Sequence, residues 1–205
     1  METTQSLIEK LNSAPQAKLI IQKVAEHIEA EGKERDKYYA LVHENIKAEF
    51  VNGEIIYQSP VKAIHWKISS KLSSKLIRHV DEKELGVVAV EKAMVSLTRN
   101  DYEPDICFWR KEVADTFSDE QMHFPAPDFI VEILSPSTEQ LDRNEKYIDY
   151  ASHDVTEYWI VDPTAKAIEK YVNNKGGYEL IEKVKTGNLA SEVIAGFEVD
   201  VEGLF

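Results

Sequence analysis

The chain has 205 residues, of which 43% are hydrophobic and 30% charged, and its formal net charge is −13. These proportions exclude a disordered, collagen-like or membrane-spanning chain, because no apolar stretch approaches the ~20 residues that a spanning helix needs. The single cysteine, Cys107, excludes an internal disulfide and a multi-cysteine zinc site. The acidic balance argues against a protein that coats nucleic acid non-specifically, although a local basic patch remains compatible with it.

The first 35 residues predict a helical appendage, followed by a domain over residues 36–205. Leu19, Ile20, Val24 and Ile28 recur at near-helical spacing. The charged run at residues 31–36 predicts a break after this helix. Residues 1–4 lack the basic start and the apolar core of a signal peptide, so we expect a cytoplasmic protein without a membrane partner.

Asn52-Gly53 lies between two extended runs and predicts a β-hairpin over residues 49–57. Residues 61–80 predict a helix with an apolar stripe four residues apart and a basic stripe beside it, formed by Lys67, Lys71, Lys75 and Arg78. Strands are expected at residues 86–97, 103–109, 128–134, 156–163, 167–172 and 178–184, with a loop-like insertion at 110–127 and a helix at 138–153. This order is typical of a mixed α/β fold.

Two carboxylates lie within apolar strands, Asp105 after Pro104 and Glu132 within residues 129–134. Buried carboxylates on neighbouring strands repel each other, and a divalent cation such as Mg²⁺ or Mn²⁺ between them removes that repulsion. Lys146 on the following helix could then orient the attacking water. The alternatives are a turn acid for Asp105, a structural ion pair for Glu132, and a surface pair with Asp142 for Lys146.

Pro104-Asp105, followed 27 residues later by Glu132, resembles the core of PD-(D/E)xK nucleases. Residues 127–138, with Lys146, Tyr150 and residues 157–163, are similar to the Uma-two family, which is named for restriction endonucleases. Residues 50–54, Ser59-Pro60 and His65 match the N-terminal pattern of that family. The resemblance covers roughly residues 36–185.

This resemblance implies a restriction-endonuclease-like αβββαβ core with a mixed sheet, to which the N-terminal appendage and extra strands are added. It implies that Asp105, Glu132 and the backbone carbonyl of Ile133 are metal ligands in an endonuclease that hydrolyses DNA with Mg²⁺ or Mn²⁺. Leu134 stands two residues after the glutamate, where the wider superfamily has lysine. In the resembled family the lysine comes from the following helix, so Lys146 is the matching residue.

Further residues are candidates for the same site. His65, Glu54 and Asp128 are possible secondary site residues, although each could instead be structural. Lys67, Lys71 and Lys75 form either a solvated helix face or a surface that binds the DNA backbone.

We expect a homodimer, because cutting both strands needs two sites. The competing hypotheses are an inert module on the same fold that binds nucleic acid or protein, and a hydrolase of another phosphate ester.

Overall fold

The computed structural model describes residues 4–43 and 46–205, so the first three residues of the predicted appendage lie outside the described part. The helices are α1 (Thr4–Ser13), α2 (Ala17–Leu41), α3 (Ala63–Glu82), α4 (Lys111–Ala114), α5 (Glu139–Arg143), α6 (Glu145–Ser152) and the 3-10 turn η1 (Glu202–Leu204). Within the described ranges, no helix combines the length and the apolar character that crossing a bilayer requires.

The strands form a main sheet, a smaller sheet and a C-terminal pair. The main sheet has the order β11 (Tyr178–Val184), β10 (Ala167–Asn173), β9 (Glu157–Asp162), β8 (Phe129–Ile133), β6 (Ile106–Arg110) and β3 (Gly86–Val90). The smaller sheet has the order β2 (Glu54–Tyr57), β1 (Ala48–Val51), β5 (Asp101–Tyr102), β4 (Met94–Ser96) and β7 (His123–Phe124). The pair is β12 (Asn188–Ala190) with β13 (Glu198–Asp200).

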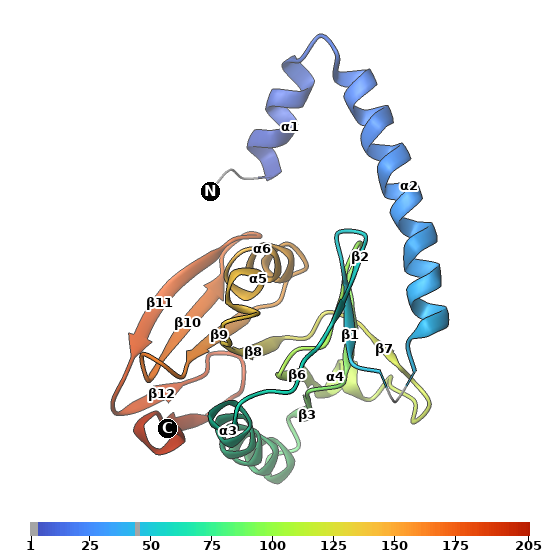
Figure 1. The fold of residues 1–205 in the computed structure, drawn as a ribbon. Coiled ribbons are helices and arrows are strands. Elements are labelled where there is room, and N and C mark those ends of the chain that lie inside the picture. The colour runs from blue at the N-terminus through green and yellow to red at the C-terminus, as the bar shows by residue number, and fades with distance from the viewer. Residues whose placement is uncertain (1–3, 44–45) are drawn as a thin grey trace.

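The main sheet carries the predicted core order. Helix α3 precedes β3, β6 and β8, which pair antiparallel, and α5 and α6 connect β8 to its parallel neighbour β9. Helix α3 and the helices α5 and α6 lie on opposite faces of this sheet (Figure 1). The chain therefore has the αβββαβ arrangement in a mixed sheet, as the sequence predicted.

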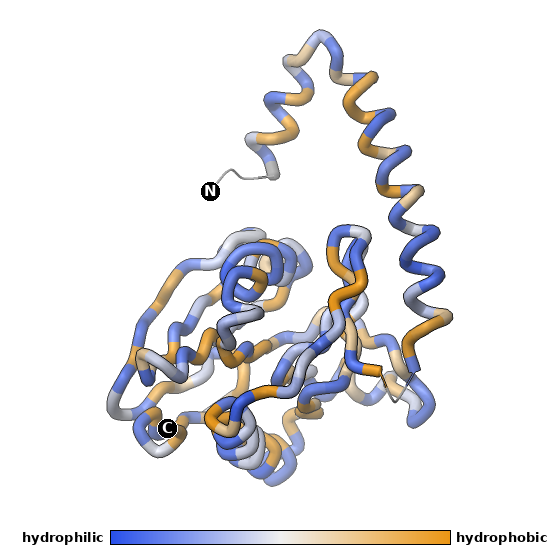
Figure 2. The backbone as a smooth tube through the Cα atoms, in the orientation of Figure 1, coloured by the Kyte–Doolittle hydropathy of each residue, from blue (hydrophilic) through white to orange (hydrophobic). Residues whose placement is uncertain are grey.

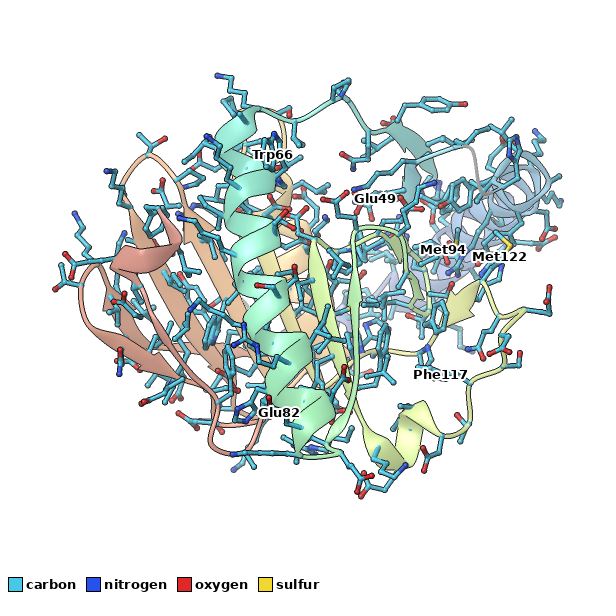
Figure 3. All side chains as sticks on the ribbon, turned by 90° about the horizontal axis from the view of Figure 1, so that it is seen from below. Glu49, Trp66, Glu82, Met94, Phe117 and Met122 are labelled. Carbon is cyan, nitrogen blue, oxygen red and sulfur yellow. The ribbon has the colours of Figure 1, made fainter. Side chains whose placement is uncertain are left out.

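Both faces of the main sheet are buried, so its central strands are apolar on both sides. Ile106, Phe108 and Val131 pack with α3 and the C-terminal elements. Cys107 and Ile130 point to the other face, where they pack with α6 and with the smaller sheet. Figure 3 shows α3 lying across the first face, between Trp66 and Glu82, with Glu49 on the side of the smaller sheet.

The hairpin of β1 and β2 forms at the predicted Asn-Gly turn. Asn52 and Gly53 have φ angles of 51° and 87°, the left-handed backbone that a two-residue type I′ turn needs. The register pairs Val51 with Glu54 across this turn. The hairpin prediction is confirmed.

Four predicted segments differ from the structure. Helix α2 continues through residues 31–36 because Glu31 and Arg35 bind Arg99 and Asp101 of the domain. The predicted strand at 86–97 separates into β3 and β4, which belong to different sheets, and the chain turns at Glu91 with a φ of 66°. The helix predicted at 138–153 is interrupted at Asn144, and the insertion at 110–127 contains α4 and β7.

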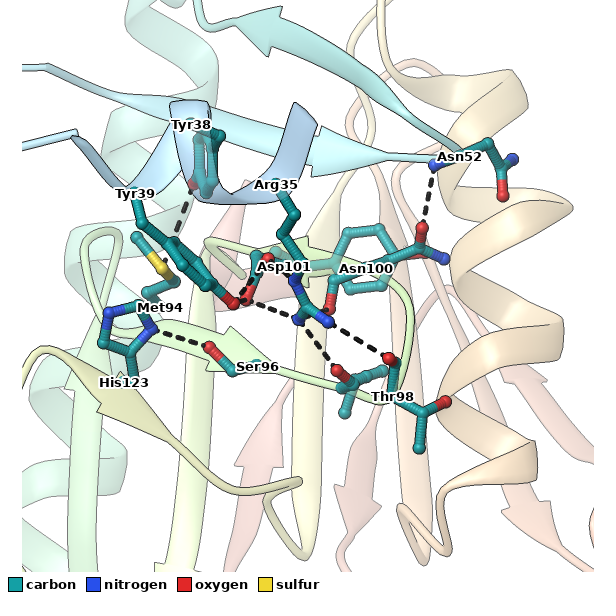
Figure 4. Close-up of polar contacts among 12 residues, drawn as sticks. Arg35, Tyr38, Tyr39, Asn52, Met94, Ser96, Thr98, Asn100, Asp101 and His123 are labelled. Atoms are coloured by element: carbon teal, nitrogen blue, oxygen red, sulfur yellow. Dashed lines mark hydrogen bonds and ion pairs between the residues drawn. The ribbon is translucent and has the colours of Figure 1, made fainter. Parts of the chain in front are cut away.

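The C-terminal part of α2 is docked on the smaller sheet (Figure 4). The guanidinium of Arg35 lies 2.6 Å from Oδ2 of Asp101, and the hydroxyl of Tyr39 donates to the same carboxylate. The buried Tyr38 donates its hydroxyl hydrogen to the Ala48 carbonyl on β1, over 2.7 Å. Helix α2 is therefore tied to the strand that carries Glu49.

Candidate active site

The register of the main sheet places Asp105 opposite Glu132. Ile106 pairs with Val131 in the antiparallel ladder of β6 and β8, so the next position outward brings these two carboxylates together. The Asp105 amide donates to Oε2 of Glu132 over 3.4 Å, and the Ile133 amide donates to Oδ2 of Asp105 over 2.7 Å. Both side chains line a cavity of about 150 Å³ at this end of the strands.

Lys146, from the first turn of α6, lies among three carboxylates. Its Nζ is 2.9 Å from Oε1 of Glu49, 3.0 Å from Oε1 of Glu132 and 3.4 Å from Oδ1 of Asp142. Lys146 is only 2% exposed, so its contact with Asp142 is a buried ion pair and not the surface pair considered from the sequence. Tyr150, one turn further along α6, donates its hydroxyl hydrogen to Oε1 of Glu132 over 2.9 Å.

Burial and charge act in opposite directions on this cluster. Burial raises the pKa of Glu132 well above its usual value, although the Lys146 ammonium opposes the shift. Burial also raises the pKa of Asp142. For Lys146, burial lowers the pKa, but Glu132, Glu49 and Asp142 outweigh it, and the net pKa lies well above the usual value. Lys146 is therefore an ammonium ion at neutral pH.

Glu49 was not predicted from the sequence as a site residue. It is fully buried on β1, where its Oε1 accepts the Glu103 amide hydrogen at 2.9 Å and its Oε2 accepts from the Gln58 side chain at 3.0 Å. Glu54, which was predicted instead, is exposed beside the turn on β2 and does not line the cavity. The hairpin carries a site glutamate, but on its other strand.

His65 lies at the N-terminal end of α3 and lines the same cavity. Its Nε2 is 3.1 Å from Oδ2 of Asp105, and its buried Nδ1 has no hydrogen-bond partner. Burial lowers the pKa of the imidazole, but the hydrogen bond and the charge of Asp105 outweigh it and raise the pKa overall. The structure thus brings His65 to the predicted metal-binding carboxylate.

Other predicted residues lie elsewhere. Asp128 lies at the far end of β8, and its Oδ2 accepts the Arg110 amide hydrogen over 2.8 Å. Lys67, Lys71 and Lys75 are exposed on the outer side of α3, and Lys71 donates to the Gly203 carbonyl. The lysines that line the cavity are Lys47, Lys62 and Lys146.

The carboxylates fit a divalent ion that shares its coordination with water and substrate. Among the described residues, no group of three or more His, Cys, Asp or Glu side chains is arranged to hold a metal ion. Protein bonds occupy Oδ2 of Asp105 and Oε1 of Glu132, which leaves Oδ1 and the weakly bonded Oε2 as candidate ligand atoms. Mg²⁺ typically takes one or two carboxylates together with waters and substrate phosphate, so this donor set suits it.

Fold and cavity together define a restriction-endonuclease-like α/β domain with an acidic site at one end of its central strands. The chain belongs to the Uma2 family, whose description reads "Putative restriction endonuclease" and whose model matches residues 35–202. The family predicted from the sequence is confirmed.

The chain is also similar to proteins of known sequence or structure. A crystal structure from Anabaena variabilis, titled as a putative nuclease of DUF820, has a TM-score of 0.71 with 19% identity, covering 83% of this chain and 96% of its own. An uncharacterized Synechocystis protein is 30% identical over 76% of both chains. A second one is 27% identical over 61% of this chain and 71% of its own.

Proposed function

We propose that this protein is an endonuclease that hydrolyses DNA phosphodiester bonds with Mg²⁺ or Mn²⁺. The observation that carries the proposal is the pairing of Asp105 with Glu132 across one cavity, next to the buried Lys146 ammonium. The family description and the nuclease title of the structural neighbour support the same reaction class. We further propose that the protein acts on DNA in the cytoplasm.

In this proposal Asp105, Glu132 and the Ile133 carbonyl hold the ion. When bound, the ion supplies a Lewis acid that polarises a phosphoryl oxygen and lowers the pKa of water. Lys146 remains protonated, so it orients the attacking water or neutralises charge on the phosphate and does not act as a general base. His65 fixes the carboxylate of Asp105 through its 3.1 Å contact.

Lys47 and Lys62 take the role of phosphate contacts, because they line the cavity and the stripe of Lys67, Lys71 and Lys75 does not. They supply positive charge close to the acidic site in a chain whose formal net charge is −13. Phosphate contacts by lysine position a nucleic acid without reading its sequence.

One observation favours the alternative of an inert binding module. Lys146 and Tyr150 already bind Oε1 of Glu132, so protein groups satisfy part of the charge that a metal ion would neutralise. In that alternative the cluster stabilises the fold and the cavity binds a phosphate group without cleaving it. The two functions differ in whether metal binding depends on Asp105.

Calorimetric titration with Mn²⁺ distinguishes the two functions. We expect saturable binding to the wild type, loss of binding in Asp105→Asn, and unchanged binding in Asp128→Asn, a matched carboxylate outside the cavity. Cleavage of a labelled DNA duplex should then be lost in Asp105→Asn and reduced in Lys146→Ala. Wild-type protein that binds no Mn²⁺, even with a DNA oligonucleotide present, would favour the inert module.

A further inference from the structure

The N-terminal part of the chain presents a large apolar surface to solvent. We call α1 and residues 17–30 of α2 the helical arm. Residues 17–30 of α2 project away from the domain and α1 turns back toward it (Figure 1), and apolar segments recur along both helices (Figure 2). Seven of its large aliphatic side chains are 37–54% exposed, namely Leu7, Ile8, Leu19, Ile20, Ile21, Val24 and Ile28.

The domain of the same chain does not cover this surface. The buried residues of α2 are Glu31 and Tyr38, both in the C-terminal part that docks on the smaller sheet. Short helices without tertiary packing are only marginally stable in water, so the arm needs a partner for its apolar face. The match to the Uma2 family begins at residue 35, so the arm lies outside the part shared with that family.

The charges on the arm indicate which partner fits. Lys18 and Lys23 lie in the N-terminal half of the exposed segment of α2, and Glu26 and Glu29 lie in its C-terminal half. Parallel pairing of two such helices would place like charges opposite each other. Antiparallel pairing places lysines opposite glutamates and also aligns the helix dipoles favourably.

The area of the arm agrees with self-association. Seven half-exposed aliphatic side chains present an apolar surface on the order of several hundred Å², which approaches the roughly 800 Å² per partner of a standard interface. Val24 lies midway between Ile20 and Ile28, so a two-fold axis near Val24 would pack these side chains against their equivalents. Two-fold pairing is the commonest symmetry of homo-oligomers.

We propose that the helical arm is a self-association surface through which two copies of this chain pair with their α2 helices antiparallel. The pairing does not depend on whether the cavity cleaves DNA. If the cavity cleaves DNA, the pairing gives the dimer two active sites, one for each DNA strand.

Light scattering on the full chain tests the proposal. We expect wild-type protein at twice the chain mass of 23.4 kDa. Val24→Glu places a charge in the apolar centre and should weaken self-association by at least ~100-fold. The matched control is Leu180→Glu, which changes an equally exposed aliphatic residue on β11 and should leave the dimer intact. Circular dichroism and thermal melting establish that each variant is folded.

A charge exchange tests the antiparallel geometry. Sedimentation equilibrium at low salt should show that Lys23→Glu weakens the dimer by about 2- to 5-fold. The double variant Lys23→Glu/Glu26→Lys should restore it, because the opposite charges again face each other across the two-fold axis. A double variant weaker than the single variant overturns the antiparallel arrangement.

Two other results overturn the proposal as a whole. One is a wild-type mass of a single chain at high protein concentration. Flotation with anionic lipid vesicles would then show whether a lipid surface covers the arm. The other is a dimer that folded Val24→Glu leaves unchanged, which would place the interface on another face.

Discussion

Lys146 is a cation held by carboxylates from three separate elements. Glu49 comes from β1, Glu132 from β8 and Asp142 from α5, and all three are buried. A buried carboxylate without a counter-charge is far more costly than one in an ion pair. The lysine therefore stabilises the fold as well as the charge distribution of the cavity, and its substitution affects both.

Replacing Lys146 with methionine should destabilise the protein by about 3–5 kcal/mol at pH 7, because it leaves buried carboxylates unpaired. The loss should be smaller at pH 5, because burial raises the pKa of both Glu132 and Asp142 and both take up protons more readily in the variant. Urea unfolding at the two pH values measures the difference. Lys67→Met, at an exposed lysine, is the control. Equal losses of stability in the two variants would contradict a stabilising role for Lys146 among the buried carboxylates.

Glu103 offers a pH-dependent prediction. Burial raises the pKa of this carboxyl to about 7, although Lys47 and Lys92 oppose the shift. The usual pKa of this carboxyl is 4.5, so its ionisation destabilises the folded protein as the pH rises from 4.5 through about 7. Glu103→Gln should stabilise the protein by ~2 kcal/mol at pH 8 and change nothing at pH 4. Thermal melting across this range measures it, and destabilisation at pH 8 would contradict the assignment.

Among the single residues of the site, the sequence predicted those whose position follows from strand pairing. Asp105 and Glu132 both interrupt apolar runs, which is a strong local signal for a buried carboxylate. Glu49 gave no such signal, because a glutamate before an Asn-Gly turn resembles any exposed hairpin residue. Its burial depends on β1 pairing with β5, which no local pattern indicates.

At the level of secondary structure, the site depends on how the strands β1, β6 and β8 converge with the helices α3, α5 and α6. Apolar periodicity identified α3, β6, β8 and β9, because each buries a continuous stripe or run. It did not separate β3 from β4, because both segments are apolar and the change of sheet occurs at Glu91. It also identified the basic stripe of α3, which the structure leaves exposed, whereas His65 of the same helix lines the cavity.

The β1–β2 turn carries a prediction at this scale. Gly53 has a φ of 87°, and an added Cβ would lie 3.1 Å from Cγ of Glu31, the residue that binds Arg99. Gly53→Ala should therefore destabilise the protein by more than about 1 kcal/mol. Gly177→Ala is the matched control, because nothing lies within 4 Å of its added Cβ. Equal melting temperatures for the two variants would contradict this account of the turn.

In the molecule as a whole, the cavity and the remaining surface differ in charge, because lysines line the cavity while the chain has a negative net charge. The formal net charge of −13 repels nucleic acid at long range, so the proposed binding of DNA depends on the few lysines at the cavity. The composition indicated a conflict between the acidic net charge and the binding of DNA. It could not resolve that conflict, because the position of Lys47 and Lys62 follows from tertiary structure. The N-terminal helices were predicted as an appendage, and the docking of α2 through Tyr38 and Tyr39 was not.

We therefore expect the affinity for DNA to depend only modestly on salt concentration, and this dependence to come from the lysines at the cavity. Lys62→Ala should reduce the slope of log K against log salt by about 1, which corresponds to one lost phosphate contact. Lys75→Ala, on the outer side of α3, should leave the slope unchanged. Fluorescence anisotropy with a labelled duplex in metal-free buffer measures the slopes of both variants. A larger change in Lys75→Ala than in Lys62→Ala would place the DNA-binding surface on the basic stripe of α3.

The central position of β8 has a consequence for how the protein opens. Its backbone is bonded on one side to β6 and on the other to β9, whereas β2 lies at the edge of the smaller sheet. In native-state hydrogen exchange, amides of β8 should exchange only through global unfolding, and those of β2 through local fraying. Glu132 on β8 would thus stay in place while β2 frays, and Glu49 would stay beside Lys146 because β1 also pairs with β5.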